Sequence, residues 1–160
     1  MIKLLTAAAA VALLAASAHA AFAPTPLKGD AAVAATMKRH AGYGEIGKAM
    51  RSAKKGIDAS DAVAVRTAAA TINRLAPAAP TWFPRGTGIG EVTLGAGHKV
   101  EARPEIWTQP AQFAASMKNF RVAAINFNRA ANGTDFAAMA TAQGALGATC
   151  KGCHEKFRAE

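Results

Sequence analysis

The residues best suited to chemistry lie near the end of the chain, in Cys150-Lys151-Gly152-Cys153-His154. Two cysteines three positions apart, with histidine directly after the second, form the C-x-x-C-H pattern typical of covalent c-type haem attachment. On a helix, positions i and i+3 share a face, so both thiols can reach the two vinyl groups along one porphyrin edge. His154 lies about 100° further round the helix, where its imidazole can turn toward the iron. The pattern predicts one covalent haem c, attached at Cys150 and Cys153 and ligated by His154.

Other uses of the two cysteines fit this sequence less well. A thioredoxin-type redox pair belongs in a βαβ context, and no strand-like stretch precedes Cys150. A structural zinc site needs four ligands, whereas the other histidines are scattered at positions 19, 40 and 98. A disulfide between Cys150 and Cys153 would close a very small loop and remove little unfolded-state entropy. Haem attachment is therefore favoured, with a redox dithiol and a metal site as the alternatives.

The first 20 residues are predicted to be a signal peptide. Lys3 gives a charged start, residues 4–16 form an apolar run, and Ala18-His19-Ala20 is a small-x-small cleavage site. The apolar run is shorter than the ~20 residues that a membrane span needs. Cleavage after Ala20 would leave residues 21–160 as a periplasmic haem domain with no membrane span; an uncleaved anchor is the alternative. Export agrees with the haem motif, because bacteria attach c-type haem outside the cytoplasm.

Composition favours a helical domain that does not bind nucleic acid. The 160 residues amount to one domain, and the 51% hydrophobic content is largely alanine, with 6% aromatic residues. Closely packed helices suit that composition better than a sheet. The formal net charge is +9, but the Lys and Arg residues are spread along the chain with no basic run or aromatic-interleaved patch. Electrostatic steering toward acidic redox partner proteins or a membrane surface explains the charge as well.

Two helices are predicted in the first half of the chain. The first begins with Asp30 as a cap and stops at Gly56. The second starts at Asp58 or Ser60 and ends at Pro77. Residues beyond Pro77 are rich in proline and glycine and lose helical periodicity as far as position 110, which predicts a long loop before the next helix.

Two further helices follow this loop. Pro110 opens the third helix, which ends at Gly133, and Thr134 or Asp135 caps the fourth. Both helices carry apolar stripes at helical spacing. The stripe of the fourth helix includes both cysteines, so both thiols are expected on the inward face of that helix. The predicted fold is an all-α antiparallel four-helix bundle with a long loop between helices two and three. The stripes are Phe113, Met117, Phe120, Ala124, Phe127 and Ala131, then Met139, Gln143, Leu146, Cys150, Cys153 and Phe157.

Gly42, Gly44 and Gly47 are unusual in the interior of the first predicted helix. Each costs roughly 1 kcal/mol relative to alanine. Close packing against a neighbouring helix would explain them. The favoured interpretation is room for a flat haem beside the backbone.

The side chain across the haem from His154 should come from the first helix. In an up-down-up-down bundle the fourth helix is antiparallel to the first, so His154 should face the first half or the middle of that helix. Met37, His40 and Tyr43 are the candidates there. Geometry alone does not choose among the three.

The chain resembles the class II cytochromes c, the cytochrome c prime family, over nearly the whole predicted mature chain. The first helix is similar to a family pattern in which Gln stands at the position of His40 and low-spin members carry a ligating Met at the position of Tyr43. The matching segments are Arg39-His40-x-x-Tyr43-x-x-Ile46-Gly47-x-x-Met50, Phe83-Pro84-x-Gly86-Thr87, Ile106-Trp107-x-x-Pro110-x-x-Phe113, and Gly144-x-x-Gly147-x-x-Cys150 leading into the haem motif.

The resemblance implies a periplasmic cytochrome whose family transfers electrons and binds nitric oxide or carbon monoxide. A neutral phenol, with a pKa near 10, is a poor haem ligand, so Tyr43 is expected to cover the iron without binding it. That leaves a five-coordinate, high-spin haem; a low-spin His/Met electron carrier is the alternative. Arg39 matches the family pattern and is expected to contact the haem. Arg158 matches a basic family residue beside the proximal histidine, where it can meet small ligands or a propionate.

Simpler roles stand beside these. Tyr43 would otherwise be an ordinary core aromatic and Arg158 a solvated charge, and for His40 a polar helix-edge role is favoured over iron ligation. No acid–base pair or nucleophile constellation stands out beyond the haem, so the chain is not expected to be an enzyme. A homodimer through the first two helices is common in the family.

Overall fold

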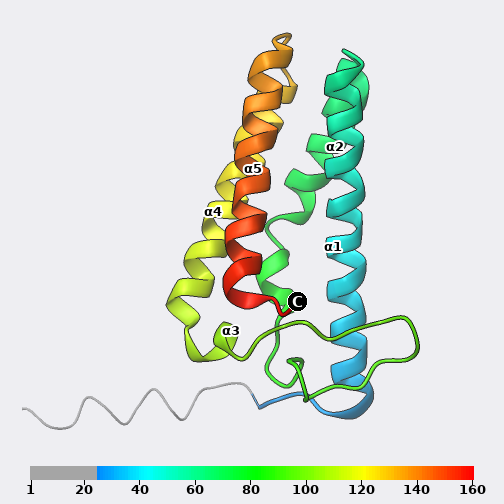
Figure 1. Cartoon of the computed structure of the whole chain (residues 1–160), viewed down its shortest axis with the longest axis vertical. Helices are drawn as coiled ribbons and strands as arrows, with labels where there is room; N and C mark the ends of the chain where they lie inside the picture. Colours follow the sequence, from blue (N-terminus) through cyan, green and yellow to red (C-terminus); the bar gives the residue numbers. More distant parts are fainter. Residues whose placement is uncertain (1–24) are drawn as a thin grey trace, which may run out of the picture.

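The computed structural model describes residues 25–160 and consists of four long helices that run side by side (Figure 1). They are α1 (Gly29–Asp58), α2 (Ala62–Leu75), α4 (Pro110–Ala131) and α5 (Phe136–Phe157). Successive long helices run in opposite directions, so the predicted all-α antiparallel four-helix bundle is confirmed. Over residues 25–160 none of the helices is both long and apolar enough to cross a membrane. The predicted signal peptide and its cleavage site lie outside the described residues.

Aspartate caps begin α2 and α5. The Asp61 carboxylate accepts hydrogen bonds from the backbone N–H groups of Val63 and Ala64, both at 3.0 Å. Asp135 caps α5 in the same way, as one of the two predicted caps. The predicted start of the second helix at Asp58 or Ser60 is wrong. Ser60 adopts a left-handed conformation with φ of 54° as the chain leaves α1, so the first residue that can cap α2 is Asp61.

The predicted ends of the first helix are also wrong. Lys28, whose side chain makes no capping hydrogen bond, precedes α1, and Asp30 lies within the first turn. The helix continues through Gly56 to Asp58. A Cβ atom at Gly56 would lie 2.9 Å from Cγ2 of Val65 on α2. Gly56 therefore lets α1 and α2 approach closely and does not stop the helix.

The predicted stripe of α4 is buried along its whole length and forms one wall of the core. On α5 the buried part of the predicted stripe is Met139, Leu146 and Phe157, while Cys150 and Cys153 are half-buried. Full burial of a Phe, Leu or Met side chain stabilises a fold by roughly 1.5–3 kcal/mol. The core of the bundle is therefore largely the one that the helical periodicity predicts.

The connection from α2 to α4 contains two short helices, η2 (Ala79–Trp82) and α3 (Glu105–Thr108). Trp82 is buried, and its ring lies so close to Gly42 that a Cβ atom there would overlap it. The interpretation of Gly42 as room for haem is therefore wrong, because this space holds the Trp82 ring. The Trp107 indole N–H donates to the Phe83 carbonyl at 3.0 Å, which ties α3 to the segment after η2.

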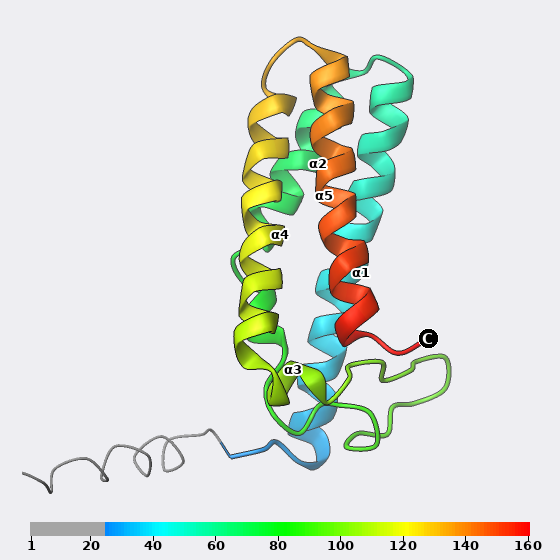
Figure 2. The same ribbon diagram turned by 60° about the vertical axis from the view of Figure 1, so that its left-hand side comes forward.

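The end of the chain is fastened to the connecting segment near α3. Ala102 and Arg158 form an isolated antiparallel bridge. The Arg103 N–H donates to the Phe157 carbonyl at 3.0 Å, and the Ala159 N–H donates to the Glu101 carbonyl at 2.9 Å. As a result the segment before α3 passes beside the C-terminal end of α5 and the first half of α1 (Figure 2).

Candidate functional site

A cavity of about 990 Å³ lies where the C-terminal half of α5 faces the middle of α1. Because α1 packs chiefly on α2 and α5 chiefly on α4, the seam between α1 and α5 is the one that opens. Its volume is at the upper end of the range for small-molecule and cofactor sites. The cavity brings together all six residues expected from the sequence to attach, ligate or contact haem: Arg39, Tyr43, Cys150, Cys153, His154 and Arg158.

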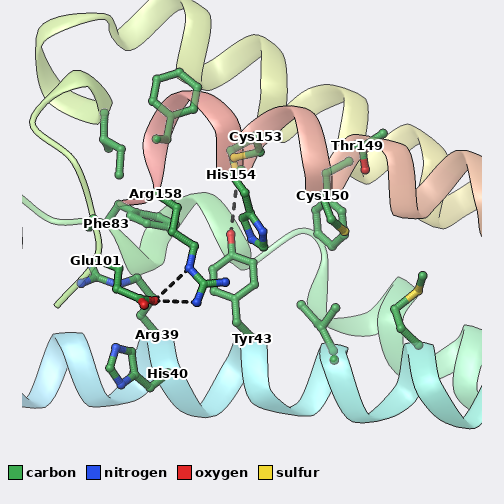
Figure 3. A pocket seen from close by; sticks show the side chains of 18 of the residues that line it. Arg39, His40, Tyr43, Phe83, Glu101, Thr149, Cys150, Cys153, His154 and Arg158 are labelled. Carbon is green, nitrogen blue, oxygen red and sulfur yellow. Dashed lines mark hydrogen bonds and ion pairs between the residues drawn. The ribbon is translucent and has the colours of Figure 1, made fainter. Parts of the chain in front are cut away.

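The α5 wall presents the two thiols and the imidazole to the same space (Figure 3). Cys150 and Cys153 are free and half-buried, and the Cys150 S–H donates to the Leu146 carbonyl at 3.5 Å. Burial raises the pKa of both thiols, that of Cys153 to about 11. Burial and the nearby Arg158 lower the pKa of His154, partly opposed by Glu101. Two cysteines and a neutral histidine are the donor set that covalent haem attachment requires.

Tyr43 projects from α1 across the cavity toward the α5 wall (Figure 3). Its hydroxyl donates to Sδ of Met117 on α4 at 3.8 Å. Its ring packs edge-on against Trp82, with centroids 5.2 Å apart, and against Phe83, with centroids 6.0 Å apart. Burial raises the pKa of the phenol, with the two cysteines adding to the shift. Tyr43 is therefore a neutral phenol held in one orientation by aromatic contacts.

Arg39 is the one charged side chain among residues 25–160 that is buried, at 5% exposure. Its guanidinium donates to the Thr87 hydroxyl at 2.9 Å and to the Thr87 carbonyl at 2.8 Å. It also lies over the Phe83 ring at 5.0 Å from the centroid, and burial lowers its pKa. Arg39 reaches the cavity, but its strongest contacts hold the segment after η2 against α1.

Arg158 forms an ion pair at the cavity rim. Its guanidinium contacts one Glu101 carboxylate oxygen through both Nε and Nη2, each at 2.8 Å (Figure 3). The two side chains remain partly exposed. The sequence alone did not reveal this partner of Arg158, because Glu101 lies 57 positions away in a segment without periodicity.

The three candidates for the position opposite His154 are separated by the fold. Tyr43 lines the middle of the cavity, and His40 lines its rim. Met37 does not line this cavity but a second, smaller pocket on the other side of His40. Two methionines that were not candidates, Met50 and Met117, do line it. Met117 belongs to the predicted α4 stripe, so periodicity placed it in the core but could not show that it faces the cavity.

The lining fits a flat, largely apolar cofactor with an anionic edge. Aromatic and aliphatic side chains from α1, α3, α4, α5 and the segment after η2 cover the interior; they are Ile46, Phe83, Ile106, Phe113, Phe120 and Phe157. The rim carries basic side chains, among them Arg51, Lys99 and Arg158. Haem has an apolar macrocycle and two carboxylates, and both parts find matching surfaces here.

Comparison with known proteins agrees with this fit. A model of the cytochrome c′ family matches residues 34–158. Cytochrome c′ of Pararhodospirillum photometricum is 37% identical over 116 residues, which cover 72% of this chain and 86% of that protein. Cytochrome c-554 of Cereibacter sphaeroides is 37% identical over 99 residues, which cover 61% of each protein. The match to this second relative therefore spans less than two thirds of its length.

Solved structures share the bundle. A cytochrome c′ described as having an unusual ligand-controlled dimer dissociation superposes with a TM-score of 0.72 at 28% identity, covering 82% of this chain and 99% of that one. Cytochrome c′ from Thermochromatium tepidum gives a TM-score of 0.70 at 25% identity, covering 81% and 97%. The helical bundle of this chain therefore recurs in solved cytochrome c′ structures.

Proposed function

The chain belongs to the cytochrome c′ family and carries one covalently bound haem c, and we propose that it works as a high-spin periplasmic cytochrome. In this proposal Cys150 and Cys153 form the thioether links, His154 ligates the iron, and Tyr43 covers the opposite face without ligating it. When bound, haem c would supply an iron that can exchange single electrons and bind a small gas.

The observation that carries the proposal is the position of the Tyr43 side chain, together with the protonated form of its phenol. Its side chain reaches from α1 toward the motif on α5, and its hydroxyl is engaged with Met117 Sδ at 3.8 Å. Because burial raises its pKa, the phenol keeps its proton at neutral pH and lacks the anionic oxygen that binds ferric iron well. Trp82 and Phe83 pack on two sides of its ring and support this covering position.

Two roles follow if Tyr43 covers the haem iron without ligating it. The first is binding of nitric oxide or carbon monoxide beneath Tyr43, in a pocket whose apolar walls suit small uncharged gases. The second is single-electron transfer to acidic redox partner proteins, supported by the basic rim and by the net charge of +9. A low-spin His/Met carrier is the alternative, and it draws on the presence of Met50 and Met117 in the same cavity. We expect binding and electron transfer, not enzymatic turnover.

A homodimer through α1 and α2 belongs to the same proposal. The solved relative with 28% identity is described as a dimer whose dissociation is controlled by ligand. On α2 the apolar Val63 side chain is 68% exposed, which suits a helix that packs on a second copy. Sedimentation with and without carbon monoxide would test whether the assembly exists and responds to the gas.

The gas-binding role can be tested by titrating the ferrous protein with carbon monoxide and recording the visible spectrum. Wild type and Tyr43→Phe should both bind the gas, because neither side chain occupies the sixth position. Tyr43→Met should become low-spin and bind the gas at least about tenfold more weakly, since the new thioether must be displaced and tenfold corresponds to 1.4 kcal/mol. A methionine–iron charge-transfer band in the ferric wild type would contradict the proposal in favour of the low-spin alternative.

A further inference from the structure

Two of the four histidines in the sequence meet outside the haem motif. His40 lies on α1, and His98 lies in the exposed segment that precedes α3. Their ring centroids are 5.7 Å apart, with an angle of 37° between the ring planes. The backbone N–H of His98 donates to the Gly95 carbonyl at 3.3 Å, and Gly97 adopts φ of +85°. This tight turn brings His98 to α1, across 58 positions of sequence.

The spacing of the two rings is that of a shared metal ion. Imidazole nitrogens bind transition metals at about 2.0–2.1 Å, which puts the centroids of two rings on one ion roughly 5–6 Å apart. The observed 5.7 Å falls in this range. The separation of the His40 and His98 rings therefore matches that of two imidazoles bound to one ion.

A third donor lies in the same small pocket. Met37, His40 and His98 line it together with Glu45 and Lys48. Met37 precedes His40 by three positions on α1, so the two side chains share a helix face. The Glu45 carboxylate is engaged by Arg74 at 2.7 Å. The pocket thus offers one thioether and two imidazoles beside the paired Glu45 carboxylate.

This donor set favours copper(I) over zinc. Thioethers select soft ions such as Cu(I), and imidazole binds copper well. Within residues 25–160 no three His, Cys, Asp or Glu side chains are grouped as a metal site, so the usual four-ligand zinc arrangement is not formed. The nearby Lys48, Lys99 and buried Arg39 repel a divalent ion about twice as strongly as a monovalent one.

The electrostatics of His40 suit ligation as well. Burial lowers its pKa, as do Arg39 and His98, while Glu101 and a hydrogen bond with the Lys99 backbone oppose the shift. The imidazole is therefore neutral at neutral pH, the form in which it binds metals.

We propose that Met37, His40 and His98 form a copper(I) site at the rim of the haem cavity. His40 and His98 line both the small pocket and the haem cavity, so the bound ion would lie at the rim beside the haem and not on it. The site goes beyond the haem function proposed above and does not depend on it, because none of its three ligands attaches or ligates haem in that proposal.

The test is anaerobic equilibrium dialysis of the holoprotein against Cu(I) buffered by a competing chelator. Copper and iron are measured in the same sample, so that iron reports haem content. Wild type should hold one copper per iron. His40→Gln and His98→Gln should each weaken binding by at least about 100-fold, and Met37→Leu by about 10-fold or more, since even groups that only orient a metal ligand contribute 10–100-fold.

Lys48→Gln is the matched control, because Lys48 lines the same pocket without being a ligand. It should bind Cu(I) at least as tightly as wild type, and Lys48→Gln and Met37→Leu, whose side chains do not line the haem cavity, should keep the wild-type haem spectrum. Substoichiometric copper in wild type, or unchanged affinity in His98→Gln, would overturn the site. Equal affinity for Zn(II) and Cu(I), together with unchanged binding in Met37→Leu, would overturn its assignment to copper and its third ligand.

Discussion

The two ends of the bundle use the same helical stripes but reach different results. One end of the bundle holds the α1–α2 and α4–α5 connections, and its core is fully buried; we call it the closed end. Ala53, Val65, Phe127 and Met139 there are all at 0% exposure. At the other end the stripes continue, yet Cys150 and Cys153 are only half-buried around a cavity of about 990 Å³. The closed end has a core filled by side chains alone, and in the proposed function haem fills the core of the open end.

This difference separates stability from chemistry. At the closed end small and large side chains fill the space by themselves, so its residues should control the free energy of unfolding. At the open end the same spacing aims thiols, an imidazole and a phenol into a shared space, so its residues should control haem retention and ligand binding. Substitutions at the two ends should therefore affect different observables.

The largest expected effect is loss of the haem. Cys150→Ser combined with Cys153→Ser removes both thioether links, so no haem should remain with the protein after acidic acetone extraction. Hydrogen exchange should then accelerate in the C-terminal half of α5, while the closed end stays protected, because haem completes only the open core. Thr149→Ser, which lines the same cavity, should retain the haem. Covalent haem in the double variant would show that attachment does not use these thiols.

A substitution that creates a cavity at the closed end should lower the free energy of unfolding without changing the haem spectrum. Phe127 is at 0% exposure, and Phe→Ala substitutions in cores cost about 3–5 kcal/mol. Urea unfolding of Phe127→Ala should show this loss, with a wild-type ferric spectrum. Phe83→Ala at the cavity wall is the counterpart and should cost less stability but shift the haem spectrum, because Phe83 supports Tyr43. A shifted spectrum in Phe127→Ala would break the separation between the two ends.

Arg39 should stabilise the fold more than an exposed arginine does. Arg39→Met removes the charge-assisted hydrogen bonds that hold Thr87 against α1 at the open end. Such bonds contribute about 1.5–3 kcal/mol to the free energy of unfolding. Arg74→Met, which breaks the exposed pair with Glu45, should cost less than about 1 kcal/mol. Chemical denaturation of both variants measures the contrast. Equal losses would mean that the burial of Arg39 adds nothing to stability.

The smallest expected effect is at the rim pair of Arg158 and Glu101. Both side chains are partly exposed, so a double-mutant cycle with Arg158→Gln and Glu101→Gln should give a coupling of about 0.2–1 kcal/mol that falls with added salt. The backbone bridge between Ala102 and Arg158 should hold the chain end in place in each variant. A coupling well above this range would show that the side chains, and not the backbone, fasten the chain end.

The sequence predicted the parts of the fold that depend on local spacing. The α4 stripe and the placement of both thiols on the inward face of α5 follow from helical periodicity, and the Asp135 cap follows from its position before a helix. Gly42 was misinterpreted because its partner, Trp82, lies far away in sequence. The partners of Arg158 and His40 were missed for the same reason, since Glu101 and His98 belong to a segment without periodicity. Local patterns place a residue on a face but do not reveal which distant segment covers it.

The most direct test of the account is the low-temperature electron paramagnetic resonance spectrum of the ferric holoprotein at neutral pH. If Tyr43 covers the iron without binding it, the spectrum should be dominated by an axial high-spin signal. Tyr43→Phe should keep that signal, and Tyr43→Met should convert it to a low-spin one. A low-spin signal in the wild type would show that a protein side chain binds the iron opposite His154, and would contradict the account.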